Sequence, residues 1–531
     1  MDSKLFFIVL LVISSCSAPK KSTLDLLNCV PQNSVITFQL NDQNMLKNAI
    51  SNLPFLSDIL AIDTVIYKKI SAVIPAKFNN KALLSFTPVG KSEYAISFIY
   101  KAVLKDSLSG VMSEKIKYNN IPVNININKD TKTFVAKIED ISIISTSKLV
   151  IENSIRNIQN NQPGIQNHYY FDLAKISDDN APMNLIIHQD FKDVLSRFFA
   201  ETPLFPFTGS DWFSFDFNTK KDPFTLDGVS FINDSIPDVL SPLKGTGSKS
   251  LLSPEYVPHN FDGFLALAIK DYKALEDNFK QYSRYKNIAL TEINFDLLNT
   301  VDEISWLKAN NKKALFFHLN NNEKINPLLL SDDNVSNVFR GVRIRQQSLP
   351  KDLLKFIAAY GTPVFPKWTI QIDDFVIMAE DDSFLKQIIS ARLDGKTLGN
   401  DFNFKKMQDG LADNSSFLWV GKTKNLTNLW HEAFKNKSIG WKKIDLTKYP
   451  LVALQGISED GFVQTRFTAQ INNVDQNKNS VTNQYSFSLD AAAAGPAKWI
   501  KNHRNKTMDI VVQDQNNVLY LFSNKGTLYW K

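Results

Sequence analysis

An internal repeat is the feature that most constrains how this chain can fold. Residues 30–33 (VPQN) open a strand-like run before Asp42 and an amphipathic helix, and residues 257–260 (VPHN) open the same succession before Asp271. Each Asp precedes apolar residues spaced three and four apart, where its side chain can cap a helix. A chain that carries the same succession of strand and helix signals twice is expected to build the same supersecondary unit twice.

The match continues in the same order along both halves. The strand-and-helix pattern of 138–158 recurs at 372–389, and that of 184–195 recurs at 416–430. A predicted hairpin turn at Asp222, flanked by strands, has its counterpart at Asp460. Four matched blocks, offset by 227 to 238 residues, are hard to obtain by chance.

These blocks predict the domain organisation. We expect two homologous modules, 30–236 and 256–472, each an antiparallel sheet with covering helices, which is the α+β class. Polar, turn-rich linkers at 237–255 and 473–485 bound the second module. The remaining residues, 486–531, hold two short strands, a Gly and a Trp, and predict a C-terminal β-hairpin.

The last residues, 508–531, resemble one repeat of a quinoprotein-type propeller, in which a Gly and a Trp follow a strand pair. A single blade cannot bury its faces, and such folds need several repeats. The sequence therefore favours either a shortened version of a longer protein or a tail that docks on the second module. An independent hairpin is the third interpretation, although an isolated hairpin is marginally stable.

The N-terminus predicts a destination. Lys4 and the apolar run 5–13 form a secretory signal too short to span a bilayer. The following residues 13–16 (ISSC) resemble a bacterial lipobox. This resemblance implies that 1–15 is a signal peptide and that Cys16 carries lipid at the start of a tether, 16–29. The alternative is an ordinary secretory signal with a chance Cys.

The residue after the lipidation site predicts in which membrane the lipid is anchored. Ser17, rather than Asp, suggests the outer membrane by the general lipoprotein sorting pattern. The acidic run that resembles a surface-export tag is missing after Cys16. We therefore expect an outer-membrane anchor that faces the periplasm.

This whole order resembles a group of flavobacterial-type Bacteroidota envelope lipoproteins. They pair tandem domain-of-unknown-function α+β modules with a propeller-like C-terminal repeat. The motifs that carry the resemblance, such as Val30 with Asp42 and Val257 with Asp271, are structural. The resemblance therefore transfers no catalytic residue to this chain.

Composition excludes several classes of protein. Hydrophobic residues make up 44 %, which is too much for a disordered chain. The net charge of +6 is small and spread along the sequence, which indicates solvated surface rather than a nucleic-acid interface. With Cys16 lipidated, Cys29 has no intramolecular disulfide partner. We interpret Cys29 as a small buried hydrophobe.

Motifs for catalysis, cofactors and metals fail on inspection. Residues 245–250 (GTGSKS) resemble the end of a phosphate-binding loop, but Ser248 separates Gly247 from Lys249. His431 and Glu432 begin like a zinc-protease helix, but Lys435 stands where the second His is needed. We therefore predict no catalytic, cofactor-binding or metal-binding residues.

Two weaker patterns point to surface chemistry. Asp-Ser/Thr-apolar triplets resemble the O-glycosylation motif of periplasmic Bacteroidota proteins, with acceptors at Thr64, Ser107 and Ser235. A second group, Arg340, Arg343 and Arg345, could contact an anionic partner such as lipid headgroups. The alternative for the arginines is a charged edge strand that resists aggregation.

The expected function follows from the address and the missing motifs. We expect a non-catalytic, outer-membrane-anchored, periplasm-facing lipoprotein that binds or scaffolds other envelope proteins. The alternative is an envelope hydrolase whose site assembles from residues distant in sequence.

Overall fold

A computed structural model of the chain describes residues 25–45, 48, 64–75, 77–78, 81–90, 93–101, 111–128, 131–190, 211–218, 224–289, 298–320, 329–330, 335–360, 363–423, 449–470, 488–503, 508–523 and 527–531. The chain divides into two compact units, Met1–Asn472 and Asn473–Lys531. Each unit is described by itself.

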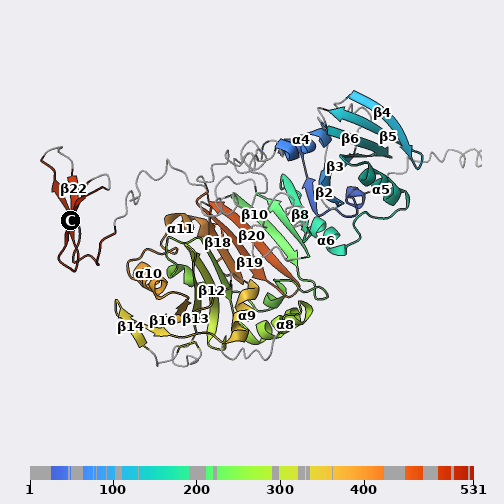
Figure 1. Cartoon of the computed structure of the whole chain (residues 1–531). Coiled ribbons are helices and arrows are strands. Elements are labelled where there is room, and N and C mark those ends of the chain that lie inside the picture. Colours follow the sequence, from blue (N-terminus) through green and yellow to red (C-terminus); the bar gives the residue numbers. More distant parts are fainter. Residues whose placement is uncertain are drawn as a thin grey trace, which may run out of the picture. The chain divides into compact units, whose positions relative to one another are not determined.

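The first unit is built on one antiparallel sheet, to which 20 strands of the described residues belong (Figure 1). From one edge, the strands of its first half run β4 (Val111–Tyr118), β5 (Ile121–Asn128), β6 (Thr131–Ile138), β7 (Ile141–Ser145), β3 (Glu93–Lys101), β2 (Ala82–Val89), β1 (Ile36–Leu40), β8 (Met183–His188), β9 (Trp212–Phe217) and β10 (Phe224–Phe231).

The second half repeats this succession of pairings. From the other edge its strands run β14 (Val335–Phe339), β15 (Val342–Gln346), β16 (Trp368–Ile372), β17 (Phe375–Ala379), β13 (Lys312–Leu319), β12 (Val301–Ala309), β11 (Gly263–Ala268), β18 (Phe417–Lys422), β19 (Leu451–Ser458) and β20 (Phe462–Gln470). Strand by strand, β11 to β20 take the places that β1 to β10 take in the first half.

The two halves are joined by their last strands. β10 pairs antiparallel with β20 from Phe224 opposite Ala469 to Phe231 opposite Phe462, and Figure 1 shows the two strands side by side. Because β10 and β20 are equivalent, this pairing has approximate twofold symmetry, like an interface between two copies of one protein. Asp227 and Arg466 are directly opposite each other at its centre.

The predicted α+β class is wrong. The chain is 42 % strand and 23 % helix, and the strands of both halves form one sheet rather than two separate helix-covered sheets. The physical reason is the β10–β20 pairing, because it satisfies the edge of each half with the edge of the other.

The helices of the first unit lie on the two faces of this sheet, and each presents an apolar stripe to it. They are α4 (Thr64–Val73), α5 (Lys148–Gln159), α6 (His168–Ile176), α8 (Tyr272–Tyr285), α9 (Lys351–Tyr360), α10 (Asp382–Leu393) and α11 (Phe402–Gln408). The described residues also include three short 3-10 turns: η1 (Leu26–Cys29), η2 (Ser241–Leu243) and η3 (Ser253–Glu255).

The three largest cores of buried apolar side chains among the described residues are one continuous core on one face of the sheet and two separate cores on the other. Adjacent strand residues point to opposite faces. Phe98 and Phe317 belong to the continuous core, which α4, α8 and α9 cover. Their neighbours Ile99 and Phe316 belong to different cores, one beneath α5 and α6 and one beneath α10 and α11. The second face is thus divided near the junction of the two halves.

The helix caps that the repeat predicts are present in both halves. Asp42 Oδ1 accepts hydrogen bonds of 2.8 Å from the N–H groups of Asn44 and Met45. Asp271 Oδ1 accepts bonds of 3.0 Å from the second and third residues of α8. An Asp carboxyl thus satisfies free N–H groups both at the helical residues that follow Asp42 and at the start of α8.

The second unit is a four-stranded antiparallel sheet, so the predicted two-stranded hairpin is wrong. Its strands are β21 (Lys498–Lys501), β22 (Met508–Gln513), β23 (Leu519–Phe522) and β24 (Leu528–Trp530). β21 and β24 extend the predicted strand pair on its two sides, with Trp499 opposite Ile510 and Trp530 opposite Leu521. Tyr520 is buried, and its hydroxyl donates a 2.9 Å hydrogen bond to Asp514 Oδ2.

Candidate functional site

A row of polar side chains crosses the middle of the large sheet. Each residue of this polar row is directly opposite the next on a neighbouring strand, from β1 across β8, β9, β10 and β20 to β19. Its members are Gln39, Asn184, Asp216, Asp227, Arg466 and Gln455. Directly opposed residues share a face of the sheet, so the row lies on the divided face.

A cavity of about 330 Å³ opens on this face, where β9, β10, β20 and β19 meet. We call it the junction pocket. Its lining includes most of the polar row, together with apolar side chains and the ends of two helix-following loops. The lining residues are Ile176, Ser177, Ser214, Asp216, Asp227, Gly228, Val229, Ala412, Gln455, Ile457, Phe462, Gln464, Thr465 and Arg466.

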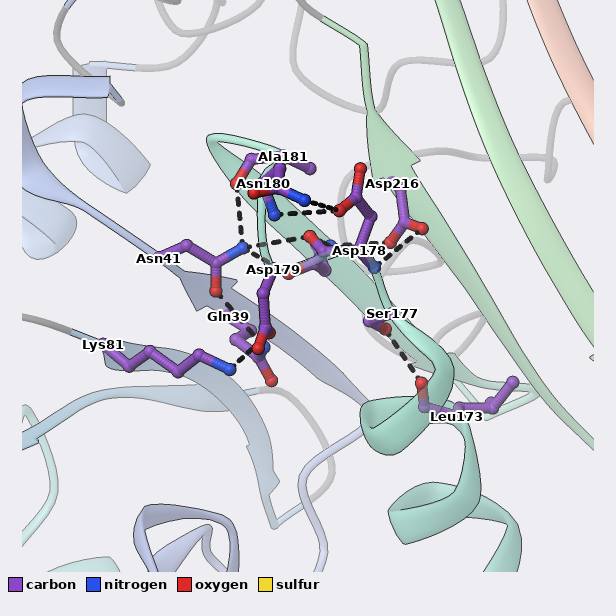
Figure 2. A network of polar contacts seen from close by, with 11 residues as sticks. Gln39, Asn41, Lys81, Leu173, Ser177, Asp178, Asp179, Asn180, Ala181 and Asp216 are labelled. Carbon is purple, nitrogen blue, oxygen red and sulfur yellow. Dashed lines mark hydrogen bonds and ion pairs between the residues drawn. The ribbon is translucent and has the colours of Figure 1, made fainter.

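The loop that follows α6 forms one wall of the pocket. Figure 2 shows Asp216 of β9 beside Asp178 of this loop, to which it is hydrogen-bonded. Asp216 Oδ1 accepts a 2.6 Å hydrogen bond from Asn184 Nδ2, and Oδ2 accepts one of 3.1 Å from the N–H of Asp178. Asn41 Nδ2 donates to Asn184 Oδ1 at 2.7 Å and to the Ala181 carbonyl at 2.8 Å. The wall is therefore held by the side chains of Asn41, which directly follows β1, Asn184 of β8 and Asp216 of β9.

The loop that follows α11 forms the opposite wall, and Gln455 fixes it in the same manner. Gln455 Oε1 accepts a 2.8 Å hydrogen bond from the N–H of Ala412, and Nε2 donates to the Ala412 carbonyl at 2.7 Å. Gln455 stands 239 residues after Asp216, as Arg466 does after Asp227. The repeat thus places equivalent side chains against equivalent loops on both sides of the junction pocket.

An ion pair lies at the centre of the junction pocket. Arg466 Nε donates to Asp227 Oδ1, and Nη1 donates to the Gly410 carbonyl at 2.9 Å. The side chains of Arg466 and Asp227 are 40 % and 42 % exposed. Arg466 Nη2 and Asp227 Oδ2 have no hydrogen-bond partner within the described ranges, and both residues line the cavity.

The ionisable side chains that line the junction pocket are one guanidinium and two carboxyls, those of Arg466, Asp227 and Asp216. Arg466 is compensated by Asp227. Burial raises the pKa of Asp216, and the carboxylates of Asp178 and Asp227 add to this effect, while hydrogen bonds from Asn184 and the Asp178 N–H oppose it. Burial therefore outweighs the hydrogen bonds that stabilise the Asp216 carboxylate.

A second buried carboxyl lies outside the junction pocket and has a structural role. Glu303 of β12 is fully buried and accepts hydrogen bonds from the Leu252 N–H at 2.7 Å, the Ser253 N–H at 3.2 Å and the Ser305 hydroxyl at 3.0 Å. Burial raises its pKa, although these hydrogen bonds lower it. Glu303 therefore fastens the segment between the two halves to β12.

The residues predicted for modification are spread over the chain. Cys16 and Ser107 lie outside the described residues. Thr64 is the first residue of α4, and Ser235 is exposed in the turn after β10, where its N–H donates to Asn233 Oδ1 at 3.0 Å. Lipidation and O-glycosylation stay predictions.

The three arginines are not gathered in one exposed cluster. Arg340, in the turn between β14 and β15, donates to Asp394 Oδ1 at 2.8 Å. Arg343 is exposed, whereas Arg345 is only 7 % exposed. Arg345 is directly opposite Thr369 of β16, and the pairing between β15 and β16 stops before Arg343. Contact with an anionic partner stays a prediction, and Arg343 is its most accessible residue.

Cys29 is placed where the sequence interpretation puts it. Its side chain is buried at the end of η1, and Sγ contacts the Asp25 carbonyl at 3.5 Å. Burial raises the pKa of Cys29 to about 12, with further contributions from the carboxylates of Asp25 and Asp140. The thiol therefore stays protonated near neutral pH and is a poor nucleophile.

The comparisons with known proteins leave the family open. No family model and no curated protein matches the chain. Two solved structures, of crystal forms I and III of TP0453, match with 13 % and 12 % sequence identity. Each match covers 40 % of this chain and 79 % or 80 % of the other, with TM-scores of 0.25 and 0.23. A likeness at this level carries no argument about fold or function.

Proposed function

We propose that this chain is a non-catalytic binding protein of the cell envelope that holds a small polar ligand in the junction pocket. The observation that carries the proposal is the central pair, in which Asp227 and Arg466 come from the two halves of the chain and line the cavity, with Arg466 Nη2 and Asp227 Oδ2 lacking a hydrogen-bond partner within the described ranges.

The walls of the junction pocket support this proposal because they are organised before any ligand arrives. Asp216 and Gln455 are each held by backbone groups of the adjoining loop. Side chains that are already fixed lose little conformational freedom when a ligand binds. Concave sites with a few convergent polar groups among apolar side chains are also the usual setting for small ligands.

The proposed address rests on the lipobox at Cys16. No helix in the described ranges is long and apolar enough to cross a membrane. A lipid on Cys16 would hold the chain at the outer membrane, facing the periplasm, where other envelope proteins are its proposed partners.

Fractionation tests the address. Cys16→Ala should leave an uncleaved precursor or release the protein from the outer membrane, because the acyl chains supply the anchor. Cys29→Ala is the control and should fractionate as wild type does. If Cys16→Ala stays in the outer membrane in processed form, the lipid anchor is wrong.

A blocked pocket tests the binding function. Val229→Trp places a large side chain in the junction pocket, whereas Val338→Trp changes a valine of β14 that is 58 % exposed. Purified variants are screened by thermal shift against a library of metabolites, since a ligand that binds only the folded protein raises the melting temperature. Ligands should stabilise wild type and Val338→Trp but not Val229→Trp. Equal shifts in all three proteins, or none in any, would contradict the proposal.

A further inference from the structure

We infer that the ligand of the junction pocket is an uncharged saccharide unit, an inference that rests on the proposed binding function and names its ligand class. The charge distribution of the junction pocket favours a neutral ligand. An anionic ligand would approach Arg466 but also the carboxyls of Asp227 and Asp216, which stand opposite each other on β10 and β9. A cationic ligand would meet the Arg466 guanidinium. A neutral ligand leaves the Asp227–Arg466 pair intact.

The hydrogen-bond donors and acceptors of the junction pocket lie side by side, as a ligand with hydroxyl groups requires. Arg466 Nη2 offers N–H groups, and Asp227 Oδ2, on the directly opposed residue, accepts. Gln464, two residues before Arg466 on the same face, is exposed and carries both a donor and an acceptor. A hydroxyl group donates and accepts at the same time, so neighbouring ring hydroxyls complement an acceptor beside a donor.

The apolar part of the lining can pack against the C–H face of a sugar ring. Phe462, Gln464 and Arg466 alternate along β20 and therefore line one side of the cavity. Val229 and Ile457 are each directly opposite Gln464 on the neighbouring strands. The C–H face of a sugar ring can pack against Phe462 and these aliphatic side chains while its hydroxyls reach the polar groups.

The size of the junction pocket agrees with a small ligand. Its volume of about 330 Å³ lies at the lower end of the range for small-molecule sites. This volume favours a monosaccharide, a disaccharide or the terminal unit of a longer glycan. Free sugars and glycan ends share the ring hydroxyls that the pocket would recognise, so the two sources need separate measurements.

The test is ligand-detected saturation-transfer NMR on the purified full chain, with isothermal titration for sugars that give a signal. One arm uses glucose, N-acetylglucosamine and maltose, and a second uses soluble chitin oligomers as glycan ends. A third arm uses glutamate and lysine as charged ligands. We expect binding in one or both sugar arms and none in the charged arm.

Two matched variants locate the binding. Arg466→Gln should weaken sugar affinity tenfold or more, whereas Arg343→Gln, which changes an exposed arginine of β15, should leave it unchanged. Phe462→Leu is a second pocket variant that keeps the side chain apolar, and it should also weaken binding. It provides the test if Arg466→Gln fails to fold.

The outcomes separate the two proposals. Binding of glutamate or lysine, abolished by Val229→Trp, with no sugar binding, would overturn the saccharide inference and keep the binding function. Sugar binding that is equal in wild type, Arg466→Gln and Phe462→Leu would overturn the inference as well. No ligand in this panel or in the metabolite library would overturn both.

Discussion

Gly228 sits at the junction of the two halves with no room for a side chain. It lies on β10 between Phe215 of β9 and Thr465 of β20. A Cβ atom at this position would lie 2.2 Å from the Ser214 carbonyl oxygen, 2.6 Å from Cδ1 of Phe215 and 2.8 Å from Thr465 Oγ1. The nearest of these atoms belongs to the backbone of β9, so Gly228→Ala should push β9 away from β10.

The cost can be estimated from what must move. Overpacking a tightly filled site costs about 1–3 kcal/mol, and each backbone hydrogen bond that β9 and β10 lose costs about 1 kcal/mol. Replacing Gly also stiffens the unfolded chain, which returns about 0.4–1 kcal/mol. The net destabilisation of the junction is therefore about 2–3 kcal/mol, or roughly a 30- to 150-fold increase in local opening, since 1.36 kcal/mol is tenfold.

Hydrogen exchange measured by mass spectrometry is the suitable assay, because it reports the opening of the junction locally in a chain of two compact units. Peptides from 211–217, 224–231 and 462–470 should exchange faster in Gly228→Ala by the factor given above. Gly263→Ala is the control, since its Cβ would meet no atom within 4 Å. Unchanged exchange at the junction in Gly228→Ala, or an equal increase in Gly263→Ala, would refute the reasoning.

Three further predictions concern single buried positions. Cys29 should resist iodoacetamide at neutral pH in the folded chain and react once the chain is denatured; rapid modification of the folded protein would contradict its buried, protonated state. The raised pKa of Glu303 favours the protonated acid in the folded state, so its contribution to stability is complete below the ordinary value of 4.5 and is lost as pH rises through the folded pKa. The melting temperature of wild type should therefore fall relative to Glu303→Gln as pH rises from about 4 to 8, and a constant difference would refute this. Gly164→Ala should lower the melting temperature, because its Cβ would lie 1.7 Å from the Val30 carbonyl oxygen, and an unchanged value would show that η1 shifts freely.

The local elements were more readable from the sequence than their assembly. Asp42 and Asp271 predict the start of a helix because a helix cap is a local interaction: the carboxyl binds N–H groups two and three residues later, next to apolar residues spaced three and four apart. The sequence has no pattern that predicts the pairing of β10 with β20, because apolar and polar residues alternate in the same way in an edge strand and in a strand inside a continuous sheet. The α+β prediction failed for that reason. The sequence does not predict β21 and β24, because residues 498–501 (KWIK), with a lysine at each end, and the three residues of β24 are weak strand signals.

The candidate site could not be predicted from the sequence. Asp216, Asp227 and Arg466 form no motif, and Arg466 is 239 residues from the carboxylate it pairs with. Only the register of β10 on β20 brings them together. The signal that could have found them is a charged residue within a predicted strand of each half at equivalent places in the repeat. The sequence predicts Arg340, Arg343 and Arg345 as one group because they are close in sequence, yet they do not form one exposed cluster in the structure.

The central claim is that the junction pocket is the ligand site, and a crystal structure of the full chain soaked with the tightest-binding ligand tests it most directly. The account predicts ligand density between β9, β10, β20 and β19, with polar groups within hydrogen-bond distance of Asp227 and Arg466. Density for that ligand at another place on the chain, with the junction pocket containing only water, would contradict it.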